Sequence, residues 1–214
     1  MKCAILPVTP FRQNCTLLWD EATGEGAVCD PGGDLDAILE AAAEAEMRID
    51  KILLTHGHLD HASGAAVLRA RLGVPIEGPH EADAFWLDRL PGETARYGFP
   101  PAEPFAPDRW LSDGDTVDAA GAVLDVRHCP GHTPGHVVFF HPELRLALVG
   151  DVLFRGSVGR SDIPHGDHDL LVRSIREKLW PLGEDVTFVP GHGQLSTFGA
   201  ERQANPFVAD SLFD

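Results

Sequence analysis

The stretch T55-H56-G57-H58-L59-D60-H61-A62-S63-G64 places three histidines and one aspartate within six consecutive positions. Directly before this cluster, the apolar run at 52–54 predicts a buried strand over residues 49–55, and the pattern after it predicts a helix over residues 61–72. The cluster therefore lies at the carboxyl end of a strand, on the loop that enters a helix. Loops in this position often carry the chemistry of α/β folds, so the stretch predicts a functional site.

The spacing inside the cluster is suited to two metal ions. His56 and His58 can direct their imidazoles to one centre when the loop backbone is extended, while Asp60 and His61 turn toward a second centre. Imidazole and carboxylate groups are ligands of zinc, iron and manganese, and no thiolate restricts the choice to zinc. One short motif can thus begin two metal sites.

Three further ligand-type residues each follow an apolar strand candidate. They are His132 in C129-P-G-H-T-P-G-H136, Asp151 in L148-V-G-D-V-L-F154, and His192 in F188-V-P-G-H-G-Q194. Asp151 is the natural bridge, because a carboxylate has two oxygens and can hold two cations about 3.5 to 4 Å apart. The remaining histidines are expected to be surface or satisfied core residues: His80, His128, His136, His141, His165 and His168.

The rest of the chain predicts strands and helices in two comparable halves of one domain, residues 1–214. Residues 4–29 are expected to form an antiparallel meander, and Asp34 is expected to cap a helix that ends at Met47. Residues 91–109 are rich in proline and predict a long irregular segment. The other expected elements are strands at 122–129, 137–140, 144–149 and 186–189 and a helix at 167–180.

The composition is that of a globular protein, with 43% hydrophobic and 23% charged residues. No apolar run approaches the length of a membrane span, and the N-terminus resembles no signal peptide, so we expect a cytoplasmic protein that does not bind membranes. With 17 basic and 33 acidic residues the formal net charge is −16, which disfavours nucleic acid as a partner. The four cysteines form no C-x-x-C pair and are expected to be buried reduced thiols.

The motif H-x-H-x-D-H at 56–61, followed in order by His132, Asp151 and His192, closely resembles the metallo-β-lactamase superfamily over almost the whole chain. The resemblance implies an α/β fold of the αββα four-layer sandwich type, with the metals at one edge. It also implies a ligand set: His56, His58 and His132 for the first metal, Asp60, His61 and His192 for the second, and Asp151 as the bridge.

Within that superfamily, the stretches GDVLFRGSVGRSD, EKLWPLGED and PGHGQLSTFGAERQANPF look like the short bacterial class of glyoxalase II, the hydroxyacylglutathione hydrolases. Full-length members carry a helical C-terminal domain that helps to bind glutathione, whereas only 22 residues follow His192 here. Members also place a Gly-Lys pair, with a tyrosine two residues after the lysine, beyond the bridging aspartate. Here Gly159-Arg160 matches that pair and Asp162 replaces the tyrosine, so Arg160 is either an anion clamp or the partner of Asp162 in a local ion pair.

These residues predict a dinuclear metal-dependent hydrolase of small acyl thioesters, with S-D-lactoylglutathione as the expected substrate. Two divalent cations that share a hydroxide lower its pKa toward about 7 and supply a nucleophile at neutral pH. A thiolate, whose conjugate acid has a pKa of about 8.5, can leave without a proton donor, and no candidate acid stands out beyond the ligands. The expected catalytic residues are Asp60 and Asp151.

Two other hypotheses remain open. A persulfide dioxygenase of similar sequence would bind one iron through His56, His132 and Asp151 and leave positions free for oxygen. A metal-stabilised binding or sensor protein without turnover would use the same ligands. The absence of a signal peptide disfavours a β-lactamase, and the net charge disfavours a nuclease.

Overall fold

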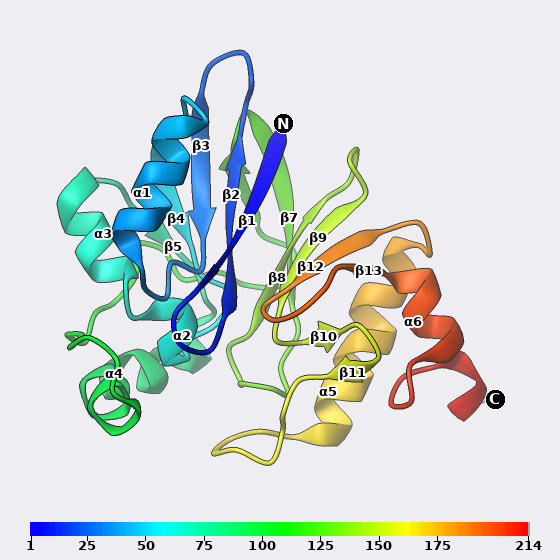
Figure 1. Ribbon diagram of the computed structural model, residues 1–214. Helices are drawn as coiled ribbons and strands as arrows, with labels where there is room; N and C mark the ends of the chain where they lie inside the picture. The colour runs from blue at the N-terminus through cyan, green and yellow to red at the C-terminus, as the bar shows by residue number, and fades with distance from the viewer. Residues whose placement is uncertain (214) are drawn as a thin grey trace.

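The computed structural model of the protein describes residues 1–213, which form two facing sheets with helices on both outer sides (Figure 1). The first sheet begins with an antiparallel meander, as the sequence predicts, and its last three strands run parallel. In spatial order its strands are β1 (Lys2–Val8), β2 (Gln13–Trp19), β3 (Glu25–Cys29), β4 (Arg48–Leu53) and β5 (Ile76–Glu77).

The second sheet comes from the second half of the chain and is mostly antiparallel. Only β12 and β9 pair in parallel. In spatial order its strands are β13 (Ser196–Thr197), β12 (Thr187–Pro190), β9 (Leu146–Gly150), β8 (Val137–His141), β7 (Ala122–His128) and β6 (Thr116–Ala119). A separate hairpin joins β10 (Leu153–Phe154) to β11 (Ser157–Val158).

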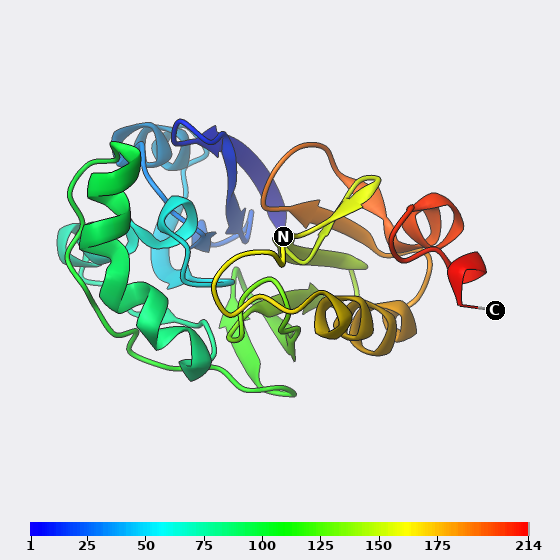
Figure 2. The same cartoon turned by 90° about the horizontal axis from the view of Figure 1, so that it is seen from below.

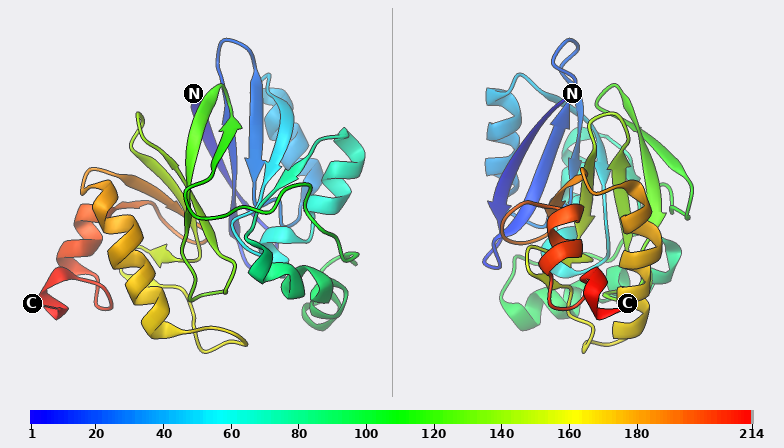
Figure 3. Two further views of the ribbon diagram at one scale, coloured as in Figure 1. Left: turned by 180° about the vertical axis from the view of Figure 1, so that it is seen from behind. Right: turned by 90° about the vertical axis from the view of Figure 1, so that its right-hand side faces the viewer.

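Helices cover the outer face of each sheet (Figures 1 and 3). Helices α1 (Leu35–Glu44) and α3 (Ala65–Leu72) pack on the first sheet, and α5 (His168–Ser174), continued by a π-helix (Ile175–Leu179), packs on the second sheet with α6 (Phe198–Ala204). Fully buried side chains such as Leu53 and Phe139 fill the space between the sheets. This arrangement confirms the αββα four-layer sandwich.

The expected helix over residues 61–72 is divided into α2 (Leu59–Ala62) and α3. Gly64 lies at the division, and a Cβ there would approach the carbonyl oxygen of Pro31 to 2.3 Å. The backbone must therefore pass close to a neighbouring loop at this point, which requires glycine.

The prediction of an irregular segment over residues 91–109 was wrong in its first part. Helix α4 (Ala84–Tyr97) continues through Pro91, and the rest of the segment, residues 98–109, contains neither helix nor strand apart from an isolated bridge between Arg109 and Glu77. Trp86, Leu87 and Leu90 are buried on one side of α4, so packing stabilises a helix that the proline weakens. Figure 2 shows α4 beside α2 at the end of the sandwich that carries the candidate site.

Two smaller predictions also fail. Asp34 makes no side-chain cap on α1, because its backbone is left-handed with a φ of 50° and its carboxylate accepts a hydrogen bond from the Thr9 amide at 2.7 Å. Cys3 is exposed on β1, which lies at the edge of its sheet, whereas the other three cysteines are buried, and all four are free thiols. Within residues 1–213, no helix is both long enough and apolar enough to cross a membrane.

The remaining helices are single turns of the 3₁₀ type: Glu81–Asp83, Trp180–Leu182 and Asp210–Leu212. The first of them leads directly into α4 and brings Asp83 into the interior.

Candidate metal centre

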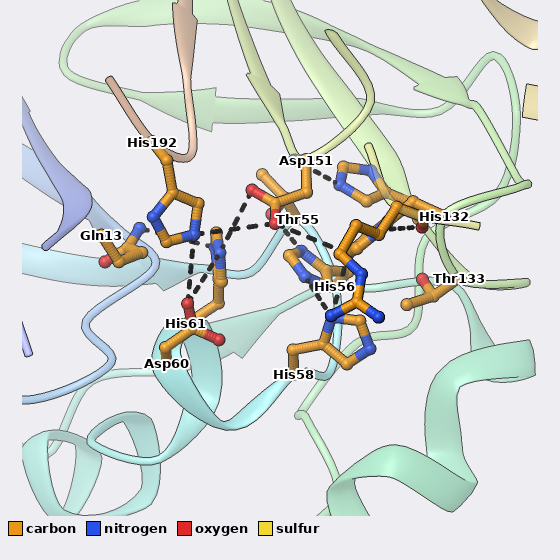
Figure 4. Close-up of polar contacts among 12 residues, drawn as sticks. Gln13, Thr55, His56, His58, Asp60, His61, His132, Thr133, Asp151 and His192 are labelled. Atoms are coloured by element: carbon orange, nitrogen blue, oxygen red, sulfur yellow. Dashed lines mark hydrogen bonds and ion pairs between the residues drawn. The ribbon is translucent and has the colours of Figure 1, made fainter. Parts of the chain in front are cut away.

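Loops from both sheets bring the seven expected ligands together at one end of the sandwich (Figure 4). The pair His56 and His58 follows β4, and His132 lies on the loop from β7 to β8. Asp151 directly follows β9, and His192 lies two residues after the end of β12. The remaining two, Asp60 and His61, lie in α2.

One group of donors consists of His56, His58 and His132. The Nδ1 atom of His58 lies 3.0 Å from Nε2 of His56 and 2.9 Å from Nε2 of His132, so the three nitrogens converge on one point. Burial lowers the pKa of all three imidazoles below the ordinary value. These imidazoles are therefore neutral at pH 7, as metal ligands must be.

A second group consists of Asp60, His61 and His192. Oδ2 of Asp60 lies 3.1 Å from Nε2 of His192 and 3.7 Å from Nε2 of His61. Burial alone would lower the pKa of His61, but the carboxylates of Asp151, Asp60 and Asp30 raise it well above its ordinary value. Such an excess of carboxylate around one imidazole is a suitable environment for a cation.

Asp151 lies between the two groups and faces both. Its Oδ2 atom is 3.5 Å from Nε2 of His132, and its Oδ1 atom is 3.4 Å from Nε2 of His61. Oδ1 of Asp151 and Nε2 of His61 are both buried and have no hydrogen-bond partner among residues 1–213. When the imidazole is neutral both atoms can act as metal ligands, so a cation bound between them would satisfy both.

Neighbouring groups hold the donor imidazoles in the required tautomer. Nδ1 of His61 lies 2.8 Å from Oδ2 of Asp30, and Nδ1 of His132 lies 2.7 Å from the Arg160 carbonyl oxygen. Because both partners are acceptors, Nδ1 must donate in each case, which leaves the lone pair on Nε2 directed at the centre. Asp30 also accepts hydrogen bonds from the amide and hydroxyl of Thr55, which precedes His56.

Asp83 connects the two loops that carry the first donor group, and the sequence offered no signal for it. Its carboxylate accepts hydrogen bonds from the Gly57 amide at 2.9 Å, the Thr133 hydroxyl at 2.8 Å and the Gly135 amide at 2.6 Å. Burial raises the pKa of Asp83 to about 6, although these three hydrogen bonds act in the opposite direction. Residues 26 to 52 positions apart meet at this carboxylate, so no short motif contains them.

His136, expected to be a surface or satisfied core residue, is a core residue that lies directly behind the centre. It is fully buried, its ring stacks on that of His56 at 4.6 Å, and its Nε2 atom accepts a hydrogen bond from the Asp151 amide at 3.0 Å. Burial lowers the pKa of His136 well below the ordinary value. His136 is therefore a neutral positioning residue for both Asp151 and His56.

A cavity of about 300 Å³, here called the α4 pocket, opens beside the centre. Its floor includes His58, Asp60 and His132. One wall is a face of α4, and the facing residues include Phe11, Arg160, Ile163 and Pro164. The pocket thus joins the candidate metal centre to an apolar and cationic surface that could hold a substrate.

Arg160 lines this pocket and also forms the ion pair that the sequence had left as an alternative. Its Nε atom donates to Oδ1 of Asp162 at 3.0 Å, and Nη2 donates to Oδ2 at 3.3 Å. Both side chains are more than 70% exposed, at 73% and 75%, so solvent screens the pair and it contributes little to stability.

Comparison with known proteins gives consistent results. A model of the metallo-beta-lactamase superfamily matches residues 8–192. The chain is 43% identical over 209 residues to hydroxyacylglutathione hydrolase GloC of Haemophilus influenzae, with 97% of this chain and 98% of that protein covered. Among solved structures it is similar to the BLEG-1 B3 metallo-beta-lactamase, with a TM-score of 0.88, 32% identity and coverage of 97% and 99%. It is also similar to TTHA1623 in a di-iron-bound form, with a TM-score of 0.85, 33% identity and coverage of 95% and 99%.

Proposed function

Because this chain belongs to the metallo-beta-lactamase superfamily, we propose that it is a dinuclear metal-dependent hydrolase of small acyl thioesters and that S-D-lactoylglutathione is among its substrates. The observation that carries the proposal is the position of Asp151, whose carboxylate lies within 3.7 Å of donor nitrogens from both groups. The 43% identity to a hydroxyacylglutathione hydrolase over nearly the whole of both chains supports the choice of a thioester.

In this proposal His56, His58 and His132 would hold one divalent cation, Asp60, His61 and His192 would hold the other, and Asp151 would be a ligand shared by both. Zinc, iron and manganese all suit this donor set. When bound, the two ions supply a hydroxide at neutral pH and polarise the carbonyl of the substrate.

The protein's own residues prepare this chemistry. Asp30 and the Arg160 carbonyl fix the tautomers of two donor imidazoles, and His136 fixes the backbone of Asp151. The ordered donors need no rearrangement when charge develops on the substrate, which is the main way that such sites stabilise a transition state.

The α4 pocket supplies the binding surface in this proposal. Trp86 lies against His58, with ring centroids 4.5 Å apart, and Phe11 lies against Tyr97 at 5.8 Å. These aromatic side chains suit the apolar stem of a thioester and exclude water from one side of it.

The first test measures metal content and hydrolysis in the same preparation. We expect about two metal ions per chain and loss of the thioester absorbance when S-D-lactoylglutathione is added. One iron per chain, together with oxygen uptake on glutathione persulfide and no thioester loss, would instead support the mononuclear dioxygenase. A preparation loaded with two metals but inert to all small thioesters would contradict the proposal.

A further inference from the structure

The α4 pocket is cationic in a protein whose net charge is strongly negative. Three arginines line it, Arg89, Arg96 and Arg160, against two acidic residues, Asp60 and Glu93. In the proposed function Asp60 binds metal, so the part of the pocket away from the centre carries more positive than negative charge. A local excess of this kind attracts an anionic ligand even when the whole chain repels anions.

Helix α4 carries three of these charged residues, Arg89, Glu93 and Arg96, along the wall of the pocket. Trp86, Arg89, Glu93 and Arg96 recur at intervals of three or four residues, so they share the face of α4 that lines the pocket. Trp86 contacts the ring of His58 and marks the end next to the metals. At 1.5 Å per residue, Arg96 begins about 15 Å farther along the helix axis.

Of the three arginines, Arg96 is the one whose charge is not engaged by a carboxylate. Arg89 pairs with Glu93 at 3.4 Å, and Arg160 pairs with Asp162. Within residues 1–213 Arg96 has no ion-pair partner within 4 Å, and its guanidinium lies 5.3 Å from the centroid of the Tyr97 ring. Tyr97 in turn packs edge to face against Phe11.

We propose that Arg96, supported by the Tyr97 ring, binds a carboxylate of the thiol half of the substrate, so that the pocket selects acyl thioesters of carboxylate-bearing, peptide-like thiols. This inference rests on the proposed function and deepens it. A guanidinium can hold a carboxylate through two parallel hydrogen bonds, which gives direction as well as affinity. A three-residue thiol spans at most about 10 Å, and the arginine side chain can cover the rest of the distance.

In this proposal Arg96 takes the anion-binding role that was one of two alternatives for Arg160 in the sequence. Tyr97 and Arg160 both line the α4 pocket. Among residues 1–213, two of the three arginines that line the pocket have a carboxylate partner and Arg96 has none, which fits a ligand that brings its own carboxylate.

The inference is tested by equilibrium binding of a thioether that cannot be hydrolysed. Calorimetry compares S-methylglutathione with its diethyl ester on the metal-loaded protein. We expect the acid to bind at least about tenfold more tightly than the ester, as a charge-assisted hydrogen bond allows. Arg96→Gln should remove this preference, and Arg96→Lys should keep part of it.

Arg48→Gln is the matched control. Arg48 is an exposed arginine at the start of β4, at the opposite end of the strand from His56, and it pairs with Glu25. Its loss should leave the preference for the acid unchanged. Arg96 lies in the last turn of α4, so thermal unfolding of each variant separates a weakened helix from a lost ligand contact.

The outcomes are distinguishable from those of the proposed function. If Arg96→Gln weakens the acid and the ester equally, or weakens neither, the carboxylate subsite is overturned whether or not the protein hydrolyses thioesters. If the acid preference depends on Arg96 but no thioester is hydrolysed, the subsite stands and the hydrolase is wrong. In an active protein, Arg96→Gln should raise KM for S-D-lactoylglutathione about tenfold and change KM for S-lactoyl-N-acetylcysteamine far less.

Discussion

Asp60 is a carboxylate of the second donor group and has no donor of the first group as an ion-pair partner among residues 1–213. Its Oδ2 atom approaches both His61 and His192, whereas Asp151 is shared with the first group. We therefore expect Asp60→Ala to reduce the metal content from about two ions to about one and to lower thioester hydrolysis more than about 100-fold, because in the proposed function it removes a ligand itself and not only a group that orients one. Elemental analysis and initial rates measure both effects.

Asp162→Ala is a suitable control for Asp60→Ala, since Asp162 is an exposed carboxylate outside both donor groups. Circular dichroism should show that both variants retain the fold. Undiminished hydrolysis in Asp60→Ala would remove the dinuclear mechanism.

His136 provides a pH-dependent test at the level of one residue. Burial lowers its pKa well below the ordinary 6.5, so its contribution to stability is present above pH 6.5 and is lost as the pH falls below that value. His136→Phe leaves the Asp151 amide without an acceptor and should cost about 1 to 3 kcal/mol at pH 8. The difference from wild type should shrink toward pH 5, because only the wild type loses stability through this group.

Urea unfolding of the metal-free protein at pH 5, 6.5 and 8 measures that difference. A free-energy gap between His136→Phe and wild type that does not change with pH would contradict the buried, neutral imidazole.

At the level of elements, Asp83 joins the loop after β4 to the loop between β7 and β8. Asp83→Ala leaves three buried donors unpaired, on Gly57, Thr133 and Gly135, and each can cost about 1 to 3 kcal/mol. We expect lower stability and a metal affinity reduced about 10- to 100-fold, since the loops that carry His58 and His132 are no longer tied together. Metal titration against a chelating indicator measures the affinity, and Asp83→Asn should restore part of it.

Helix α4 offers a prediction in the stabilising direction. Pro91 lies inside α4 and is exposed, has no amide hydrogen to donate to Leu87, and crowds the preceding turn. Pro91→Ala should therefore raise the free energy of unfolding by about 1 to 3 kcal/mol. Gly92→Ala is the reference, because a Cβ at position 92 meets no atom within 4 Å and should add about 1 kcal/mol.

Neither Pro91 nor Gly92 lines the α4 pocket, so KM for a thioester should not change in these variants. Lower stability in Pro91→Ala would mean that the helix requires the local bend that proline introduces.

For the whole molecule, the candidate centre is also a junction between the two sheets. His58, which follows β4 of the first sheet, contacts His132, which lies between β7 and β8 of the second sheet. The backbone amide of Asn14 on β2 donates a hydrogen bond to the carbonyl oxygen of Gly191, just after β12, at 2.7 Å. Metal bound at this junction would stabilise the folded state alone. At a metal concentration 1,000 times the Kd this amounts to about 4 kcal/mol.

We therefore expect a strong chelator to lower Tm and to make the unfolding transition depend on added zinc or iron. Returning the metal should restore both Tm and hydrolysis. An unchanged Tm after complete removal of metal, checked by elemental analysis, would show that the junction is held by protein contacts alone.

Much of the fold could be predicted because its signals are local. Apolar runs and helical spacing located β4, β7, β8, β9, β12, α1 and α5 with its π-helical continuation to within a few residues. The elements that were missed are short strands such as β5 and β13, and the helices α4 and α6. Two-residue strands carry no periodic pattern, and a proline inside α4 concealed a helix that is stabilised by its buried face.

By itself, the sequence determined which side chains could form the centre, because imidazole and carboxylate groups follow the apolar runs that become β4, β9 and β12. Only the tertiary structure decided how they meet. His58 and His132 are 74 residues apart, Asp83 and Gly135 are 52 apart, and the facing arginines of the α4 pocket depend on where α4 packs. The physical reason is the separation of these residues along the sequence. Spacing in the sequence predicts contacts within one helical turn or one strand, whereas these contacts form only when the two sheets pack face to face.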